Sequence, residues 1–136
     1  VTIIVVSIWQ NIGFLMIIYT AGLQTIPKDV MESAELDGCS GLKKVLKIEL
    51  PLLMPTVTIN LFVSISGAFK SFDIPNAMTG GGPYGSTMPV AMNIYQEAFT
   101  KYNLGYGSAK SVILFLTVAA VTLIQLYCTR KKEVEY

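Results

Sequence analysis

The first 23 residues, VTIIVVSIWQNIGFLMIIYTAGL (Val1–Leu23), contain no Asp, Glu, Lys or Arg. A helix that crosses the hydrocarbon core of a bilayer needs about 20 apolar residues, so this stretch predicts a membrane span over about residues 1–23. The alternative is a buried helix of a soluble bundle, which would carry charges along one face at helical spacing. Because this stretch has no such face, we expect an all-α transmembrane protein.

Two further apolar stretches predict membrane-spanning helices over about residues 50–70 and 106–127. The last one contains Lys110 near its beginning, and a span there requires the lysine ammonium to reach toward the headgroups. A loop of about residues 25–48 joins the first two spans, and a loop of about residues 72–104 joins the last two. Because the chain starts at Val1 inside an apolar run, we expect it to be a fragment of a longer polypeptide.

The composition agrees with a membrane protein and excludes several other classes. Hydrophobic residues make up 52% of the 136 residues and charged residues only 14%, against about a quarter in soluble domains. A net charge of +1 gives no reason to expect a nucleic-acid partner. The chain has no His and only two cysteines, Cys39 and Cys128, so we expect no metal site, no cofactor and no disulfide.

Basic residues predict the orientation of the spans, because Lys and Arg accumulate in cytoplasmic loops. The loop between the last two spans holds only Lys101, with Lys70 and Lys110 at its edges. The other basic residues are Lys28, Lys43, Lys44 and Lys47 in the first loop, and Arg130, Lys131 and Lys132 in the C-terminal tail. We therefore expect residues 24–49 and the C-terminus on the cytoplasmic side of a cell membrane, and residues 72–104 outside.

The first loop, IPKDVMESAELDGCSGLKKVLKIELP (Ile26–Pro51), carries signals for a short helix. Pro27 suits the first helical position, Asp29 suits the first turn, and Gly38 can end the helix with a positive φ. A helix of about ten residues is marginal alone in water, so its apolar face must pack against another surface. A second short helix is expected over about residues 41–48, leading into the second span.

The spacing within this loop resembles the EAA loop of ABC importer permeases, in which Glu-Ala-Ala, three residues, Gly and nine residues precede Ile-x-Leu-Pro. Here the elements are Glu32-Ser33-Ala34, Gly38 and Ile48-x-Leu50-Pro51, with Ser33 in place of one alanine. The resemblance implies a coupling helix that docks on a cytoplasmic ATPase subunit. Carried over by position, the implied coupling residues are Glu32, Ser33, Ala34, Asp37 and Gly38.

The stretch TGGGPYG (Thr79–Gly85) contains the spacing G-x-G-x-x-G of a dinucleotide-binding turn. Such a turn lies between a strand and a helix, whereas this one follows an apolar span and is expected outside the cell, so a nucleotide site is disfavoured. The stretch resembles instead the external loop of maltose, lactose, multiple-sugar and glycerol-3-phosphate permeases. The implied loop residues are Thr79, Gly80, Gly81, Gly82 and Pro83, followed by a short helix over residues 89–101.

Polar residues inside the predicted spans indicate a solute path or contacts between helices. On the second span they fall at i, i+4, i+7 and i+11, on one helical stripe. Packing between helices through small and hydroxylated residues is the alternative. The resemblance to sugar permeases implies a substrate path lined by these residues, by their neighbour Ala68 and by polar and aromatic positions on the first span. The full set is Gln10, Asn11, Phe14, Asn60, Ser64, Gly67, Ala68 and Ser71.

The resemblance implies a non-catalytic membrane subunit of an ATP-driven sugar importer, with residues 1–136 as the C-terminal part of one permease domain that lacks its N-terminal spans. The implied partners are the cytoplasmic ATPase subunits, a second permease subunit, an extracytoplasmic solute-binding protein and the lipid bilayer. Two alternatives remain at the level of sequence. The chain could belong to a permease for a non-sugar solute, or it could be a truncated permease that binds the ATPase without transporting anything.

Overall fold

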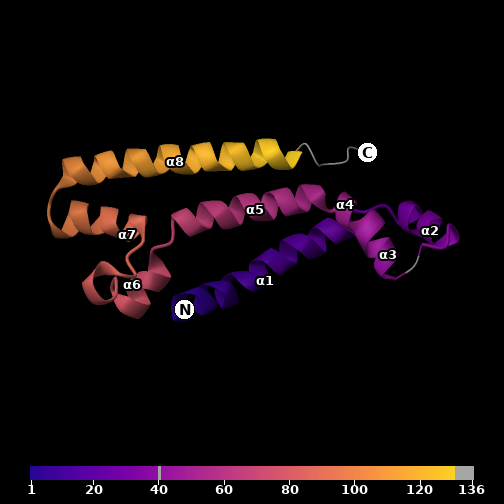
Figure 1. Ribbon diagram of the computed structural model, residues 1–136, viewed down its shortest axis with the longest axis horizontal. Helices are drawn as coiled ribbons and strands as arrows, with labels where there is room; N and C mark the ends of the chain where they lie inside the picture. The colour runs from indigo at the N-terminus through magenta and orange to yellow at the C-terminus, as the bar shows by residue number, and fades with distance from the viewer. Residues whose placement is uncertain (40, 131–136) are drawn as a thin grey trace. The chain divides into compact units, whose positions relative to one another are not determined.

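The computed structural model describes residues 1–39 and 41–130, and within those ranges every regular element is a helix (Figure 1). Contacts divide the chain into two compact units, each of which is described by itself. Of the described residues, the first contains 1–10 and 63–124, and the second contains 11–39, 41–62 and 125–130. The prediction of an all-helical protein is confirmed.

Among the residues that the structure describes, two helices are long and apolar enough to cross a membrane. They are α1 (Thr2–Gln24) and α8 (Leu104–Arg130), with 23 and 27 residues. At 1.5 Å per residue, α1 is about 35 Å long, which exceeds the roughly 30 Å of a hydrocarbon core. The third predicted span, residues 106–127, lies inside α8, which begins two residues earlier and ends three residues later.

The second predicted span is not one straight helix. Residues Leu42–Leu52 and α5 (Met54–Phe69) meet at a bend of 65°, and together they are long and apolar enough to form one broken span. The first part comprises α3 (Leu42–Lys44), the π-helix η1 (Val45–Glu49) and the short α4 (Leu50–Leu52). Pro55 follows the break closely, and it lacks an N–H and its ring crowds the carbonyl four residues earlier. The predicted span over residues 50–70 thus covers α4 and α5, with the break between them at Leu53.

The predicted short helix of the first loop is α2 (Lys28–Leu36). Pro27 precedes this helix with φ −59° and ψ 135°, so it is the residue before the first turn rather than its first member. Its extended ψ lets the chain turn into the helix while its ring still fixes φ. The second short helix of the loop is formed by α3 and η1, near the expected residues 41–48.

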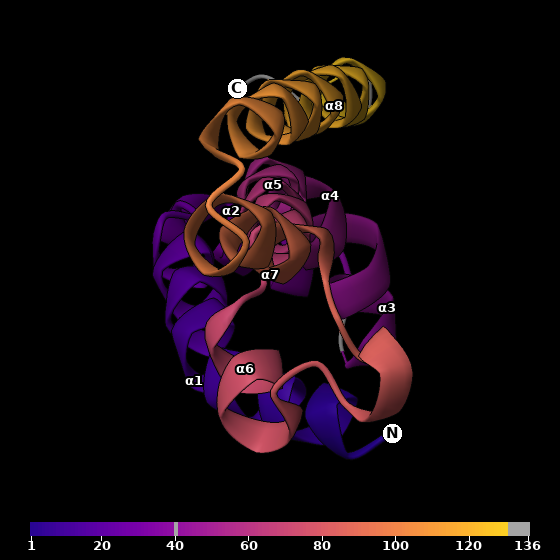
Figure 2. The same cartoon turned by 90° about the vertical axis from the view of Figure 1, so that its left-hand side faces the viewer.

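The second loop is more helical than expected. It contains α6 (Asp73–Thr79), the 3-10 turn η2 (Pro83–Gly85), and α7 (Val90–Tyr95) continued by the π-helix η3 (Gln96–Thr100) (Figure 2). The helix predicted for residues 89–101 is thus present as α7 and η3. The helix α6 was not predicted, and its Pro75 lies in the first turn, where a proline removes no helical hydrogen bond.

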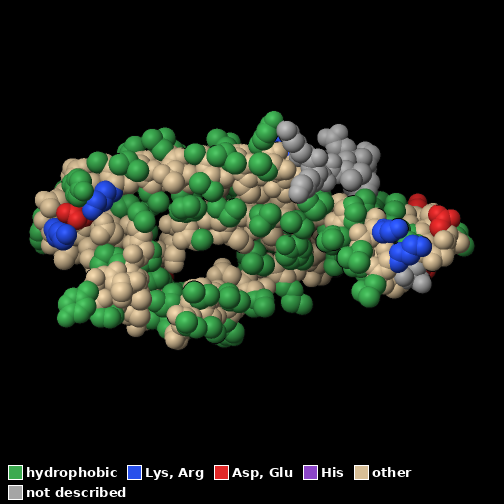
Figure 3. All heavy atoms as spheres, in the orientation of Figure 1, with side chains coloured by type: hydrophobic (Ala, Val, Ile, Leu, Met, Phe, Trp, Pro, Cys, Tyr) green, Lys and Arg blue, Asp and Glu red, His purple; other side chains and the backbone are tan. Residues whose placement is uncertain are grey.

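Charged side chains gather over two parts of the chain, one over α2 and α3 and the other over η3 and the beginning of α8 (Figure 3). Large apolar side chains on the long helices are exposed, including Ile8, Trp9 and Ile17 on α1 and Phe115 on α8. Surfaces of this kind suit contact with lipid or with other apolar helices. Of the basic residues used to predict orientation, Lys131 and Lys132 lie outside the described residues.

Candidate functional site

The helix α2 ends where its sequence predicts. Gly38 has φ +73°, a conformation that costs an L-residue with a Cβ about 1–2 kcal/mol. The N–H groups of Gly38 and Cys39 donate to the carbonyls of Glu35 and Ala34 at 3.0 and 2.9 Å. These bonds satisfy carbonyls that the end of a helix would otherwise leave unpaired. The prediction of a positive φ at Gly38 is confirmed, and Gly38 fixes the direction in which the chain leaves α2.

An ion pair connects α2 to the helix that follows it. The Lys44 ammonium donates to Oε1 of Glu35 at 2.6 Å. This hydrogen bond, together with the positive charge of Lys44, holds the pKa of the Glu35 carboxyl below its usual range. Ala34 is buried, with 6% of its surface exposed, so the small residue of the motif lies on the packed side of α2.

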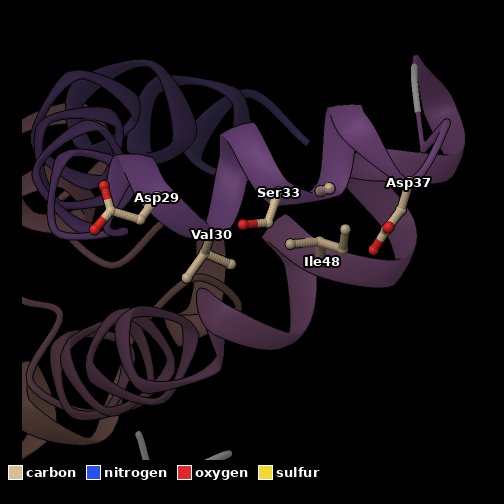
Figure 4. Close-up of a pocket in the computed structure, with 6 residues that line it drawn as sticks. Asp29, Val30, Ser33, Asp37 and Ile48 are labelled. Atoms are coloured by element: carbon tan, nitrogen blue, oxygen red, sulfur yellow. The ribbon is translucent and has the colours of Figure 1, made fainter.

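A shallow groove of about 410 Å³ runs along one side of α2. Val30, Ala34 and Ile48 supply its apolar lining, and Figure 4 shows Ser33 and Ile48 between Asp29 at one end and Asp37 at the other. The two carboxylates are exposed, and neither forms a salt bridge with another described residue. The groove therefore combines apolar contact area with negative charge at both ends.

The coupling residues implied by the motif fall on different sides of α2. Ser33 and Asp37 lie at the groove, Ala34 is buried at its base, and Glu32 is exposed without lining the groove. Glu32 and Asp37 are therefore both available to a partner, but on different faces. Ala34 contributes to packing within the chain, and Gly38 forms the turn at the end of α2.

A close contact between α1 and α5 lies near the two ends of this loop. A Cβ added to Gly22 would lie against Oγ1 of Thr56, 2.8 Å from its Cγ2 and 2.9 Å from its Cβ. Only glycine permits this approach without a shift of the backbone. The contact brings the end of α1 and the beginning of α5 together, and it thereby fixes the base from which the loop projects.

The predicted path residues differ in exposure. Asn60 is 3% exposed, and its Nδ2 lies 3.5 Å from the carbonyl oxygen of Leu15, so it packs between helices within its unit. For Asn60 the packing alternative fits better than the path. Ser71 is half-buried. The remaining members of the set are exposed, and they are Gln10, Asn11, Phe14, Ser64, Gly67 and Ala68.

The glycine stretch of the second loop forms a tight turn at the end of α6. Gly80, Gly81 and Gly82 have φ of +57°, +100° and +68°, values that residues with a Cβ rarely adopt. The turn is closed by hydrogen bonds from the N–H of Gly82 to Thr79 and of Thr87 to Gly81, at 2.9 and 3.0 Å. Since α6 precedes the turn and the short 3-10 turn beginning at Pro83 follows it, the strand-turn-helix setting of a dinucleotide site is missing.

The main feature that the sequence reasoning missed is Glu97, which is 8% exposed. Its carboxylate accepts from Asn103 at 3.2 Å, from Lys101 at 3.1 Å and from Lys110 at 3.3 Å. Lys110 was expected to reach toward headgroups, and in the structure its ammonium donates to Asn93 and Glu97. The signal in the sequence was the i,i+4 pair Glu97–Lys101 and a lone lysine in an apolar helix.

Within the described ranges, no three His, Cys, Asp or Glu side chains come together as a metal site requires. The described residues offer an exposed acidic helix, hydroxyls and amides on apolar helices, and a hydrogen-bonded turn in the second loop.

Comparisons with known proteins agree with this description. A "Sulfoquinovosyl glycerol transport system permease protein SmoG" from Agrobacterium fabrum is 40% identical over 126 residues, which cover 93% of this chain and 41% of the relative. A "Probable starch degradation products transport system permease protein AmyD" from Thermoanaerobacterium thermosulfurigenes is 39% identical over 132 residues, covering 97% and 45%. An "sn-glycerol-3-phosphate transport system permease protein UgpA" from Brucella abortus is 37% identical over 131 residues, covering 96% and 45%.

The chain thus spans a little under half the length of these curated relatives. The family model described as "Binding-protein-dependent transport system inner membrane component" matches residues 1–134, nearly the whole sequence. This chain therefore belongs to the family of inner membrane components of binding-protein-dependent transport systems.

Proposed function

We propose that the chain is part of a membrane subunit of an ATP-driven importer for a sugar or a related solute. The observation that carries the proposal is the geometry of α2, a short acidic helix held between Pro27 and Gly38 beside two apolar helices. The permease relatives support the solute class, because their names refer to starch degradation products, sulfoquinovosyl glycerol and sn-glycerol-3-phosphate. The subunit itself catalyses nothing, and ATP is hydrolysed by another subunit.

In this proposal α2 docks on a cytoplasmic ATPase subunit and transmits its movement to α1 and α5. Glu32 and Asp37 are exposed and can pair with basic groups of the partner. The ion pair Lys44–Glu35 and the close contact Gly22–Thr56 support the helix from within the chain. A supported helix transmits force, whereas a flexible loop of the same length would absorb it.

In this proposal the long helices, the second loop and the C-terminus have roles that follow from their predicted position relative to the membrane. The exposed polar residues of α1 and α5 line part of the solute path, together with a second permease subunit. The second loop faces an extracytoplasmic solute-binding protein. The first loop and the C-terminus are cytoplasmic, in keeping with the lysines of residues 28–47.

Cysteine crosslinking tests the docking of α2 and the sidedness together. In the full-length protein with all native cysteines replaced by serine, Leu36→Cys on α2 and Tyr84→Cys on the second loop provide matched probes, because these side chains are 89% and 107% exposed. We expect Leu36→Cys to crosslink to the ATPase subunit in the assembled complex and Tyr84→Cys not to do so. Crosslinking of the ATPase through Tyr84→Cys alone would overturn the proposed orientation.

Uptake of labelled solutes tests the substrate class. Cells that carry the complete transport system are supplied with maltotriose, sulfoquinovosyl glycerol, sn-glycerol-3-phosphate and an amino acid mixture. We expect ATP-dependent uptake of at least one of the three carbohydrate-related solutes and none of the amino acids. Uptake of amino acids alone would place the protein with importers of another solute class.

A further inference from the structure

A buried carboxylate connects the second loop to α8. Glu97 on η3 has two oxygens, and both accept hydrogen bonds: Oε1 from Asn103 Nδ2 at 3.2 Å, and Oε2 from the ammonium groups of Lys101 and Lys110 at 3.1 and 3.3 Å. The backbone N–H of Asn103 also donates to the carbonyl of Glu97, at 3.0 Å. A carboxylate with this many donors is stabilised in its charged form even where little water reaches it.

Lys110 is the partner that joins Glu97 to α8. Its ammonium donates to Oδ1 of Asn93 at 2.8 Å as well as to Glu97, and it lies 4.4 Å from the centre of the Tyr106 ring. One lysine of α8 therefore contacts side chains from both α7 and η3. Its side chain is 25% exposed, whereas that of Lys101 is 59% exposed, so water screens the Lys110 interaction less.

Close apolar packing accompanies the polar contacts. A Cβ added to Gly107 of α8 would lie 2.7 Å from Cβ of Ala98, so η3 and α8 approach as closely as glycine allows. On the other side of the segment, the rings of Tyr95 and Phe72 pack edge to face with centres 5.2 Å apart. Phe72 directly precedes α6, and Met92 of α7 is 2% exposed, which places α7 and η3 between the beginning of α6 and α8 (Figure 2).

We propose that Glu97 is a positioning residue that locks α7 and η3 onto α8, so that they move as one body. In this arrangement the segment acts as a strut that fixes Phe72, just beyond the end of α5, relative to the outer part of α8. The consequence for uptake rests on the proposed transport function, in which exposed residues of α5 line the solute path. The lock itself follows from the contacts and needs no assumption about transport.

Hydrogen exchange of the full-length protein in lipid nanodiscs tests the lock. Replacing Glu97 by Gln leaves Lys110 partly buried and without its carboxylate. We therefore expect the amides of residues 90–100 to exchange about 10-fold faster or more. Lys110→Met should give a similar local increase, while Lys101→Met should give a smaller one because its ammonium is exposed. Glu35→Gln is the matched control, since it breaks an ion pair on α2 and should leave exchange of residues 90–100 unchanged.

Exchanging the charges of Glu97 and Lys110 distinguishes a positioning role of this ion pair from a general loss of structure in the single variants. Glu97→Lys combined with Lys110→Glu restores opposite charges, so we expect it to recover most of the protection that Glu97→Lys alone removes. Exchange of residues 90–100 that stays unchanged in Glu97→Gln, or that is not restored by the reversed pair, would overturn the lock.

Uptake in the same variants tests the consequence for transport. We expect Glu97→Gln to lower the uptake rate and the reversed pair to restore it. Faster exchange with an unchanged uptake rate would overturn the role of the strut in transport. Because exchange is measured without any solute, a wrong substrate class would leave the result for the lock intact.

Discussion

Gly22 should be one of the positions least tolerant of an added methyl group. Its Cβ would lie against Oγ1 of Thr56, and within 2.8 and 2.9 Å of Thr56 Cγ2 and Cβ, whereas ordinary contacts are 3.4–4 Å. Rotation of the threonine moves Oγ1 and Cγ2 but not Cβ, so the helices must separate. Overpacking of this kind lowers the free energy of unfolding by about 1–3 kcal/mol. The higher helix propensity of Ala than of Gly raises it by about 1 kcal/mol at most. We expect Gly22→Ala to destabilise the protein by up to about 2 kcal/mol.

Gly13 on the same helix is the matched control, because an added Cβ meets nothing within 4 Å there. Gly13→Ala should keep the propensity gain without the overpacking, and so stabilise the protein by up to about 1 kcal/mol. The free energies of unfolding of the two variants should therefore differ by about 1–3 kcal/mol. The measurement is unfolding of the full-length protein in mixed micelles by dodecyl sulfate, followed by far-ultraviolet circular dichroism.

A compensating change completes the test. Thr56→Gly removes the three atoms nearest to the added methyl group, so Gly22→Ala should cost less in the Thr56→Gly background than in the native one. Equal stabilities of Gly22→Ala and Gly13→Ala, or an unchanged cost after Thr56→Gly, would refute the close contact between α1 and α5. Uptake should fall in Gly22→Ala, because the first loop, which docks on the ATPase in the proposed function, projects from this contact.

Three further predictions concern the loop and the path. Gly38→Asp should leave membrane insertion intact but uncouple ATP hydrolysis from uptake, because φ of +73° strains any residue with a Cβ; normal uptake by this variant with the ATPase bound would contradict the coupling role. Lys44→Met should raise the pKa of Glu35, measured by carboxyl NMR. Since the folded-state pKa of Glu35 is lowered, the native pair stabilises the fold above a pH of about 4.3 and loses its effect as the pH falls through the folded-state value. Asn11→Leu should reduce uptake if Asn11 contacts the solute, and unchanged uptake would remove it from the path.

Local signals in the sequence were sufficient where they act within a few residues. The absence of charge over residues 1–23 predicted a long apolar helix, and α1 has that form because its length and composition alone satisfy the requirement. Gly38 predicted its own positive φ, and the glycines of TGGGP adopt left-handed conformations for the same reason. The spacing of the EAA-like motif predicted the family, which the match over residues 1–134 confirms.

Features that depend on residues distant in sequence could not be predicted in this way. The sequence placed Asn60 on a stripe with Ser64, but its burial depends on how α1 packs against α5, and no pattern along one helix contains that information. The break near Pro55 could not be predicted either, because the sequence alone does not show which of several prolines interrupts the helix. The candidate path therefore stays a prediction for its exposed members.

The sequence by itself determined the class of the protein, the positions of its apolar helices and the turns that only glycine permits, because hydrophobic length and backbone sterics are local properties. Only the tertiary structure decided which partners the charged residues meet. Lys110 pairs with Glu97 across 13 positions of sequence, and Lys44 pairs with Glu35 across nine. The physical reason is that the energy of a charge depends on burial and on the nearest opposite charge, and both are set by how the helices pack.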